Sequence, residues 1–303
     1  MNVAALPASD LRDRLAGPGL AWRSGPFTLQ LRSDLEAVHQ GIGLLYAHHE
    51  LAPADSWVDF SVRIERPRGL RRWVRPQVRF LFDDAPVFEP LPTQHALPLT
   101  EWALNWCISS HAHQFLVLHA AVVARGDRAA VLPAPPGSGK STLCAALVNR
   151  GWRLLSDELA LIDLADSRLW PLVRPVSLKN RSIDLIADFA PEAVFSERTV
   201  DTHKGTVALM RPKSEDVLAG QRPARAEWVV LPRWVADAPP LLSPRSRPDT
   251  LIELSRNAFN LGPTSRDGFE ALCRMLDGCS CHDFSYSRLD DAISAFDRLA
   301  DAD

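Results

Sequence analysis

The chain has 303 residues, of which 46% are hydrophobic and 23% are charged, and its formal net charge is -3. Such a composition is typical of globular proteins, and the small negative charge excludes a global attraction to nucleic acid or to an anionic membrane. No apolar run approaches the roughly 18 residues that a membrane span needs, and the N-terminal residues do not show the pattern of a secretory signal. Five scattered cysteines predict reduced thiols, so we expect a cytoplasmic protein with no membrane partner.

The N-terminal third of the chain favours a module that mixes helices and strands. Apolar residues recur at helical spacing in some segments and alternate in others. The expected helices cover 8–19, 33–51 and 98–113, and the expected strands cover 57–67 and 77–84. We therefore predict an N-terminal α+β module over residues 1–112.

An arginine-rich stretch lies inside this module, at 63–79, with Trp73 among seven arginines. We interpret it as a solvated hairpin face, because prolines interrupt it and the chain is acidic overall. Docking of an acidic partner is the next alternative. Nucleic-acid binding, with Arg on phosphates and Trp stacked on bases, is the least favoured, and we expect no nucleic-acid partner.

The remaining residues, 113–303, are predicted to form a second domain. It opens with two strands over 114–135, joined at Gly126–Asp127. The segment "VLPAPPGSGKSTLCAALVNRG" then indicates a strand, a loop and a helix that ends at Gly151. The later expected elements are strands over 152–173, a surface connection over 232–249, helices over 249–260, 265–278 and 288–300, and a strand over 281–287.

The loop fits the phosphate-binding pattern G-x-x-x-x-G-K-[ST] except at its first position, where Ala134 replaces Gly. Gly137 and Gly139 allow backbone N–H groups to point inward, and the following helix adds its N-terminal dipole. Lys140 supplies a positive charge for the β- and γ-phosphates, and the Ser141 hydroxyl can bind Mg²⁺. The predicted ATP-binding residues are Ala134, Pro135, Pro136, Gly137, Ser138, Gly139, Lys140, Ser141 and Thr142.

Two acidic residues, Asp157 and Glu158, end the first strand after the loop helix. In translocating and switch ATPases the metal-binding Asp usually lies further along the chain, and no segment similar to LSGGQ is present. The short spacing therefore favours a phosphoryl-transfer enzyme. In such an enzyme an acid beside the γ-phosphate holds Mg²⁺ or accepts the proton of the attacking hydroxyl.

Taken together, "LHAAVVARGDRAAVLPAPPGSGKSTLCAALVNRGWRLLSDE" resembles the catalytic core of HPr kinase/phosphorylase. Beyond this core, "RPVSLKNRSIDLI", "DTHKGTVA" and "CHDFSYSRLDDAISAFDRL" are similar to the subgroup called HprK-related kinase A. The resemblance implies an α/β fold with a phosphate-loop core of the HPr kinase/PEP carboxykinase type and a C-terminal segment of helices and a strand. It also implies ATP and Mg²⁺ as cofactors.

The resemblance assigns roles to several residues. Asp157 would be the general base, with His119 beside it to tune its proton affinity. Lys140 would act on the transferring phosphoryl group, and Ser141 and Glu158 would hold the metal. Without the resemblance, His119 in an apolar strand would be read as a core histidine.

Four further polar residues are weaker candidates for contacts to substrate or phosphate: Arg174, Lys179, Asn180 and Lys204. A cation that reaches the transferring group would lower the barrier electrostatically. Surface positions are the alternative for each of them.

The predicted function is transfer of the γ-phosphoryl group of ATP to a hydroxyl, with a Ser on a small protein or peptide as acceptor. A peptide-chaperone-like protein is a plausible partner from the resemblance, and a homo-oligomer is compatible with it. The N-terminal module does not match that of HPr kinase, so nothing favours HPr itself as the acceptor. Two alternatives stay open: a small-molecule kinase of the shikimate or gluconate type, and an ATP-binding regulatory protein without turnover.

Overall fold

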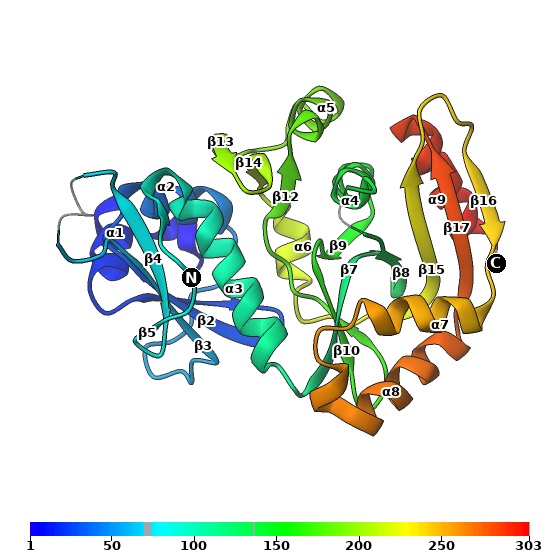
Figure 1. Ribbon diagram of the computed structural model, residues 1–303, viewed down its shortest axis with the longest axis horizontal. Coiled ribbons are helices and arrows are strands. Elements are labelled where there is room, and N and C mark those ends of the chain that lie inside the picture. Colours follow the sequence, from blue (N-terminus) through cyan, green and yellow to red (C-terminus); the bar gives the residue numbers. More distant parts are fainter. Residues whose placement is uncertain (70–73, 136, 303) are drawn as a thin grey trace.

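The structure, a computed structural model, describes residues 1–69, 74–135 and 137–302, and these form a mixed α/β protein (Figure 1). The helices are η1 Val3–Ala5, α1 Ala8–Ala16, α2 Glu36–Leu45, η3 Thr93–His95, α3 Ala96–His111, α4 Lys140–Asn149, α5 Arg181–Phe189, α6 Ser214–Leu218, α7 Arg247–Arg256, α8 Leu261–Asp277 and α9 Leu289–Asp301. The strands are β1 Leu20–Ser24, β2 Phe27–Ser33, β3 Phe60–Glu65, β4 Gln77–Phe82, β5 Ala85–Pro86, β6 Leu91–Pro92, β7 Phe115–Arg125, β8 Arg128–Pro133, β9 Arg153–Ser156, β10 Leu159–Asp163, β11 Leu169–Trp170, β12 Val176–Lys179, β13 Thr199–Thr202, β14 Gly205–Met210, β15 Arg225–Trp234, β16 Leu241–Pro244 and β17 Ser280–Tyr286.

The N-terminal elements build one sheet in the order β1-β2-β3-β4-β5, with β6 paired to β4. Helix α3 packs on β3 and β4 and lies between this sheet and the rest of the protein (Figure 1). The expected helices and both expected strands are present. The hairpin of β1 and β2 was not predicted. Its turn is short, and its one local signal in the sequence is Gly25, which adopts a positive φ.

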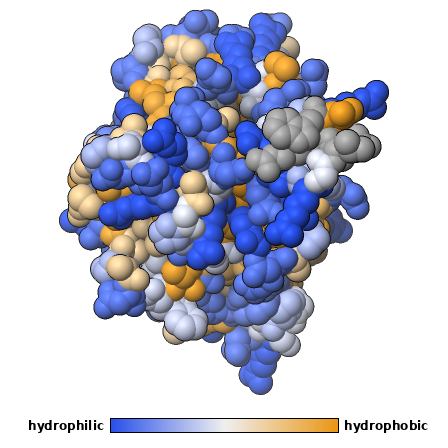
Figure 2. Space-filling view, turned by 90° about the vertical axis from the view of Figure 1, so that its left-hand side faces the viewer, coloured by the Kyte–Doolittle hydropathy of each residue, from blue (hydrophilic) through white to orange (hydrophobic). Residues whose placement is uncertain are grey.

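The outer face of the N-terminal part is mostly hydrophilic, with apolar side chains in small separate areas (Figure 2). In the arginine-rich stretch, Arg63 pairs with Asp84, and Arg79 donates to Glu65 at 3.0 Å. Surface charges are thus partly neutralised within the module, and the solvated-hairpin interpretation stays a prediction. Arg71, Arg72 and Trp73 of that stretch lie outside the described residues.

The largest sheet has eight strands in the order β11-β10-β7-β8-β15-β17-β16, with β9 also paired to β7. The hairpin of β7 and β8 turns at Gly126–Asp127, as predicted. Strand β15 runs parallel to β8 and β17 and was not predicted. The segment 232–249 lies mostly at the surface, as expected, but it also contains strand β16, which was not predicted and whose backbone pairs with β17 along the sheet edge.

Strand β7 decides where the cores meet, because its side chains alternate between the two faces of the sheet. On one face, Leu118 and Val122 pack with the core beneath α7 and α8. On the other face, Val117 joins the N-terminal core, and Val123 joins the core beneath α4 and α9. His119 lies on this second face, so it falls at the seam between the N-terminal core and the core of α4.

The N-terminal core extends into the rest of the chain, because Phe115, Val117 and Leu159 pack with N-terminal side chains. The division at residues 112 and 113 stays a prediction. The five cysteines are all free thiols. Among the described helices, none is long and apolar enough to cross a membrane.

Candidate functional site

The Gly- and Pro-rich loop connects β8 to α4, which begins at Lys140. Gly137 and Gly139 adopt φ values of 87° and 94°, a backbone region that L side chains rarely adopt. The neighbouring strands hold the loop: the Trp234 N–H donates to the Ser138 carbonyl at 3.1 Å. In an α-helix the N–H groups of the first turn have no partner within the helix and point out of its N-terminal end. At the start of α4 these groups can therefore stabilise an anion. Pro136 lies outside the described residues.

A cavity of about 600 Å³ lies in front of this loop, and we call it the loop cavity. The predicted site residues that line it are His119, Pro135, Gly137, Ser138, Gly139, Lys140, Ser141, Thr142, Glu158, Lys179, Asn180 and Lys204. Of the other predicted residues that the structure describes, Ala134, Asp157 and Arg174 are buried and do not line it. Most of the predicted residues, drawn from distant parts of the sequence, thus lie around one hollow.

Among the residues that the structure describes, three buried polar atoms at this site have no hydrogen-bond partner: Ser138 Oγ, Lys140 Nζ and Asp157 Oδ1. A buried polar group without a partner costs free energy, so such groups are uncommon in a folded protein unless a ligand or water binds them. Burial lowers the pKa of Lys140, and the charges of Asp157 and Glu158 oppose that shift. A buried cation and hydroxyl beside a helix N-terminus fit a phosphate group, and a free carboxylate oxygen next to them fits a hard cation such as Mg²⁺.

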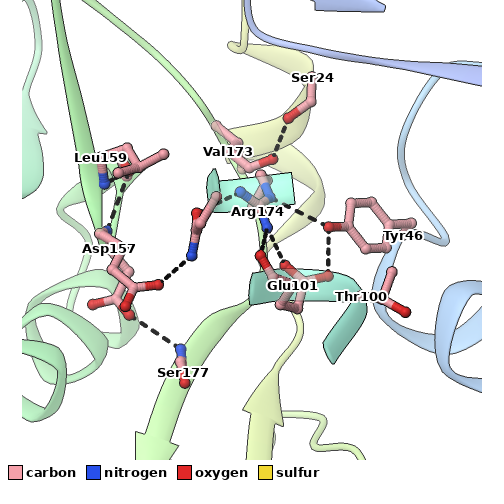
Figure 3. A network of polar contacts seen from close by, with 12 residues as sticks. Ser24, Tyr46, Thr100, Glu101, Asp157, Leu159, Val173, Arg174 and Ser177 are labelled. Atoms are coloured by element: carbon pink, nitrogen blue, oxygen red, sulfur yellow. Dashed lines mark hydrogen bonds and ion pairs between the residues drawn. The ribbon is translucent and has the colours of Figure 1, made fainter. Parts of the chain in front are cut away.

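Asp157 is 5% exposed and lies in the break between β9 and β10. Its Oδ2 accepts a hydrogen bond from the Ser177 N–H at 3.1 Å (Figure 3). Burial raises the pKa of Asp157 to about 6, against the opposing charge of Lys140. Asp157 is therefore a buried carboxylate whose electrostatic partner is the lysine of the loop.

The side chain of Glu158, the next residue, faces the loop cavity, unlike that of Asp157. Its side chain is 24% exposed and lines the loop cavity. Its Oε2 accepts a hydrogen bond from Asn105 Nδ2, and its Oε1 lies 4.0 Å from Lys204 Nζ. Burial alone would raise the pKa of Glu158, but the positive charges of Lys204, Lys179 and Lys140 outweigh it and lower the pKa. Glu158 is therefore an ionised carboxylate that faces the cavity.

His119 pairs with Leu159 across β7 and β10, which brings its ring beside Glu158. Burial, followed by the charge of Lys140, lowers the pKa of His119 to about 4, although Glu158 opposes the shift. The ring is therefore neutral at pH 7 and stacks on Phe259, with the ring centroids 5.7 Å apart. The predicted effect of His119 on Asp157 stays a prediction, since the carboxylate that acts on its charge here is Glu158.

The end of strand β12, which holds Lys179, and the turn between β13 and β14, which holds Lys204, bring the two predicted lysines together. The Asn180 side-chain oxygen accepts from the Thr206 N–H at 3.0 Å, and the Asn180 N–H donates to the Thr206 carbonyl at 2.8 Å. Between them Gly205 has no room for a side chain, because a Cβ would lie 2.3 Å from Asn180 Oδ1. This contact fixes Lys179 and Lys204, one residue before Asn180 and Gly205, beside the same cavity.

Arg174 has a different place from the one predicted. Its Nη2 lies 2.6 Å from Glu101 Oε2, and both side chains are 7% exposed. Its Nη1 donates to Asn105 Oδ1 at 2.6 Å, and Tyr46 Oη donates to Glu101 at 2.7 Å. Figure 3 shows Arg174 turned toward Glu101 and Tyr46, both from the N-terminal module. Arg174 therefore joins that module to the rest of the protein and does not reach into the loop cavity.

Helix α3 contributes residues that the sequence did not single out. Asn105 bridges Arg174 to Glu158 through its amide group. The Trp102 ring lies against Lys204, with Nζ 5.2 Å from the ring centroid, and against the His203 ring at 4.6 Å. One signal was present: Glu101 and Asn105 are polar residues one turn apart, among the apolar residues of the middle of the helix.

The pKa of Asp157 leads to a testable change in stability. Because the folded protein holds the Asp157 proton up to about pH 6, against an ordinary value near 4, the contribution of Asp157 to stability should fall as the pH rises from 4 to 6. Asn cannot ionise, so Asp157→Asn should raise the free energy of unfolding at pH 7 by up to about 3 kcal/mol. Urea unfolding between pH 4 and 8 would measure this, with Asp188→Asn, an exposed position on α5, as control. A variant that follows the wild-type pH curve would contradict the shift.

No family model and no curated protein matches the chain. Among solved structures, the chain is similar to the Hpr(Ser) kinase/phosphatase from Coxiella burnetii, with 14% sequence identity and a TM-score of 0.25. That alignment covers 62% of this chain and 99% of the other. The assignment of a function therefore has to rest on the site itself.

Proposed function

We propose that this protein is a kinase that transfers the γ-phosphoryl group of ATP to a hydroxyl, with the Ser of a small protein or peptide as acceptor. The observation that carries the proposal is the combination at the loop cavity. A helix N-terminus, the Lys140 ammonium and the Glu158 carboxylate line it, and the buried Asp157 carboxylate lies behind it. Phosphoryl transfer needs positioning and charge stabilisation of this kind.

The loop and its lysine would bind the phosphates of ATP. Backbone N–H groups at the start of α4 would donate to phosphate oxygens, and Lys140 would lose its unpartnered state when its ammonium meets the β- and γ-phosphates. Ser141 and Asp157 are the residues that would hold Mg²⁺, since Asp157 has an unpartnered oxygen next to the loop lysine. When bound, Mg²⁺ would neutralise charge on the phosphates.

The placement of the two carboxylates favours an exchange of the roles that the family resemblance implies. A general base has to reach the acceptor hydroxyl, and Glu158 faces the cavity whereas Asp157 is buried behind it. Glu158 is also ionised at neutral pH, because three lysines lower its pKa. We therefore propose Glu158 as the base.

The Ser oxygen forms a bond to the γ-phosphorus, while the bond from that phosphorus to the β–γ bridging oxygen breaks and its electron pair leaves with ADP. The Ser proton passes to Glu158. Lys204, 4.0 Å from Glu158, and Lys179 would stabilise the negative charge of the transferring group.

A binding and transfer experiment tests the proposed function. We expect wild-type protein to bind Mg-ATP and to move labelled γ-phosphate to serine-containing peptides or, more slowly, to water. Lys140→Ala should weaken ATP binding by about 10–100-fold, which corresponds to loss of a charged hydrogen bond. Titration calorimetry and phosphate release would measure both. Lys213→Ala, a lysine outside the loop cavity, is the matched control.

Two results would contradict the proposal. ATP affinity unchanged in Lys140→Ala would mean that the loop does not bind the phosphates. Tight ATP binding by the wild type, with no label moved to water or to any peptide, would favour a regulatory protein without turnover.

A further inference from the structure

A second cavity adjoins the loop cavity on the side of the N-terminal module, and we call it the aromatic cavity. Its volume is about 460 Å³. It shares Glu158, His119, His203 and Lys204 with the loop cavity, but none of the described loop residues, 134–135 and 137–142, lines it. Its other walls are mainly apolar, and they include Leu91, Leu99, Trp102, Trp106 and Phe259.

We propose that the aromatic cavity binds an aromatic or branched aliphatic side chain of the acceptor peptide, next to the Ser that receives the phosphoryl group. This inference rests on the proposed kinase function and specifies its substrate. The N-terminal module is then the part of the protein that selects the acceptor.

The order of the residues along the two cavities indicates where the acceptor residue would lie. The phosphates would lie at the loop, and Glu158 and His119 border both cavities. An acceptor hydroxyl has to approach the γ-phosphate opposite the leaving ADP, roughly in line with the bond that breaks. The side of Glu158 away from the loop is the aromatic cavity, so the residue that carries the hydroxyl has to lie at its entrance.

The apolar walls of the aromatic cavity indicate which kind of side chain it would bind. Phe88 and Trp106 are packed against the N-terminal core, so part of this wall is explained by folding alone. Phe259 is different: it is 49% exposed, yet its ring lies on His119 at the border of the two cavities. An apolar ring left half-exposed beside reactive polar groups fits a site that a ligand covers.

The size and energetics agree with a side chain plus its backbone. A volume of about 460 Å³ lies within the usual range of ligand pockets, roughly 300–1,000 Å³. Full burial of a Leu or Phe side chain contributes about 1.5–3 kcal/mol. That energy corresponds to a roughly 10–100-fold gain in affinity over an acceptor that has no such side chain.

Four short acetylated peptides would test the inference. Each contains one serine flanked on both sides by Phe, Leu, Gly or Glu. Calorimetry without nucleotide measures binding, and labelled Mg-ATP measures transfer. We expect the Phe and Leu peptides to bind at least about 10-fold more tightly than the Gly and Glu peptides. Equal binding of all four peptides, or no measurable binding of any of them, would overturn the inference.

A matched pair of variants locates the effect. Phe259→Ala should remove most of the preference for the Phe peptide, whereas Phe269→Ala, 45% exposed on α8 and outside the aromatic cavity, should keep it. Thermal unfolding by circular dichroism checks that both variants fold. The same loss of preference in both variants would contradict the assigned cavity.

The two readouts separate this inference from the proposed function. Preferential binding of the apolar peptides without any transfer of label supports the cavity and contradicts the kinase activity. Transfer to all four peptides at equal rates supports the kinase activity and overturns the cavity.

Discussion

Replacing Glu158 with Gln should lower phosphoryl transfer by about 10²–10⁴-fold, the range for loss of a general base, with a much smaller effect on Mg-ATP affinity. Gln has nearly the same shape and can still accept from Asn105, but it cannot accept the proton of the acceptor. Initial rates of label transfer, together with calorimetric ATP affinity, would measure the split. Glu158→Asp, which keeps the carboxylate on a shorter arm, should recover part of the rate.

Asp157→Asn is the comparison that assigns the two roles. If Asp157 helps to hold Mg²⁺, this variant should need a higher Mg²⁺ concentration for half-maximal ATP binding, because one anionic oxygen next to Lys140 is lost. Glu158→Gln should leave that concentration close to the wild-type value. An unchanged Mg²⁺ requirement in Asp157→Asn, with transfer abolished, would instead restore the roles that the family resemblance implies.

The second large effect is structural. Arg174→Met should destabilise the protein by about 3–5 kcal/mol, because it leaves the Glu101 carboxylate buried without its cation. The two side chains are 7% exposed, so water cannot replace the lost partner. Urea unfolding followed by tryptophan fluorescence would give the free energy.

A double variant and a surface control separate this pair from a general loss of packing. Arg174→Met with Glu101→Leu should be much more stable than Arg174→Met alone, since both charges are then removed. Arg266→Met breaks an exposed pair with Glu270 on α8 and should cost less than about 1 kcal/mol. Equal costs for Arg174→Met and Arg266→Met would show that the buried pair is not a strong one.

Much of the local structure could be predicted because its causes are local. The β7–β8 hairpin follows from alternating apolar residues around Gly126–Asp127, and α4 starts where Gly139 ends the loop. Strand β15 was missed since nothing in its immediate neighbourhood marks it as parallel to β8 and β17. The contact of Asn180 with Gly205 was also out of reach, because it joins two segments through side-chain and backbone packing.

For the candidate site, the sequence by itself determined the loop, its lysine and the position of the two carboxylates one strand later. These features depend only on residue type and on short spacings along the chain, and local backbone geometry is enough to place them. The tertiary structure alone decided that Glu158 faces the cavity while Asp157 is buried, and that Arg174 pairs with Glu101. It also decided that residues of α3 line a second cavity. These outcomes depend on how the N-terminal module packs against β7 and β10, and a side chain's direction at such a seam is set by its partners from both sides.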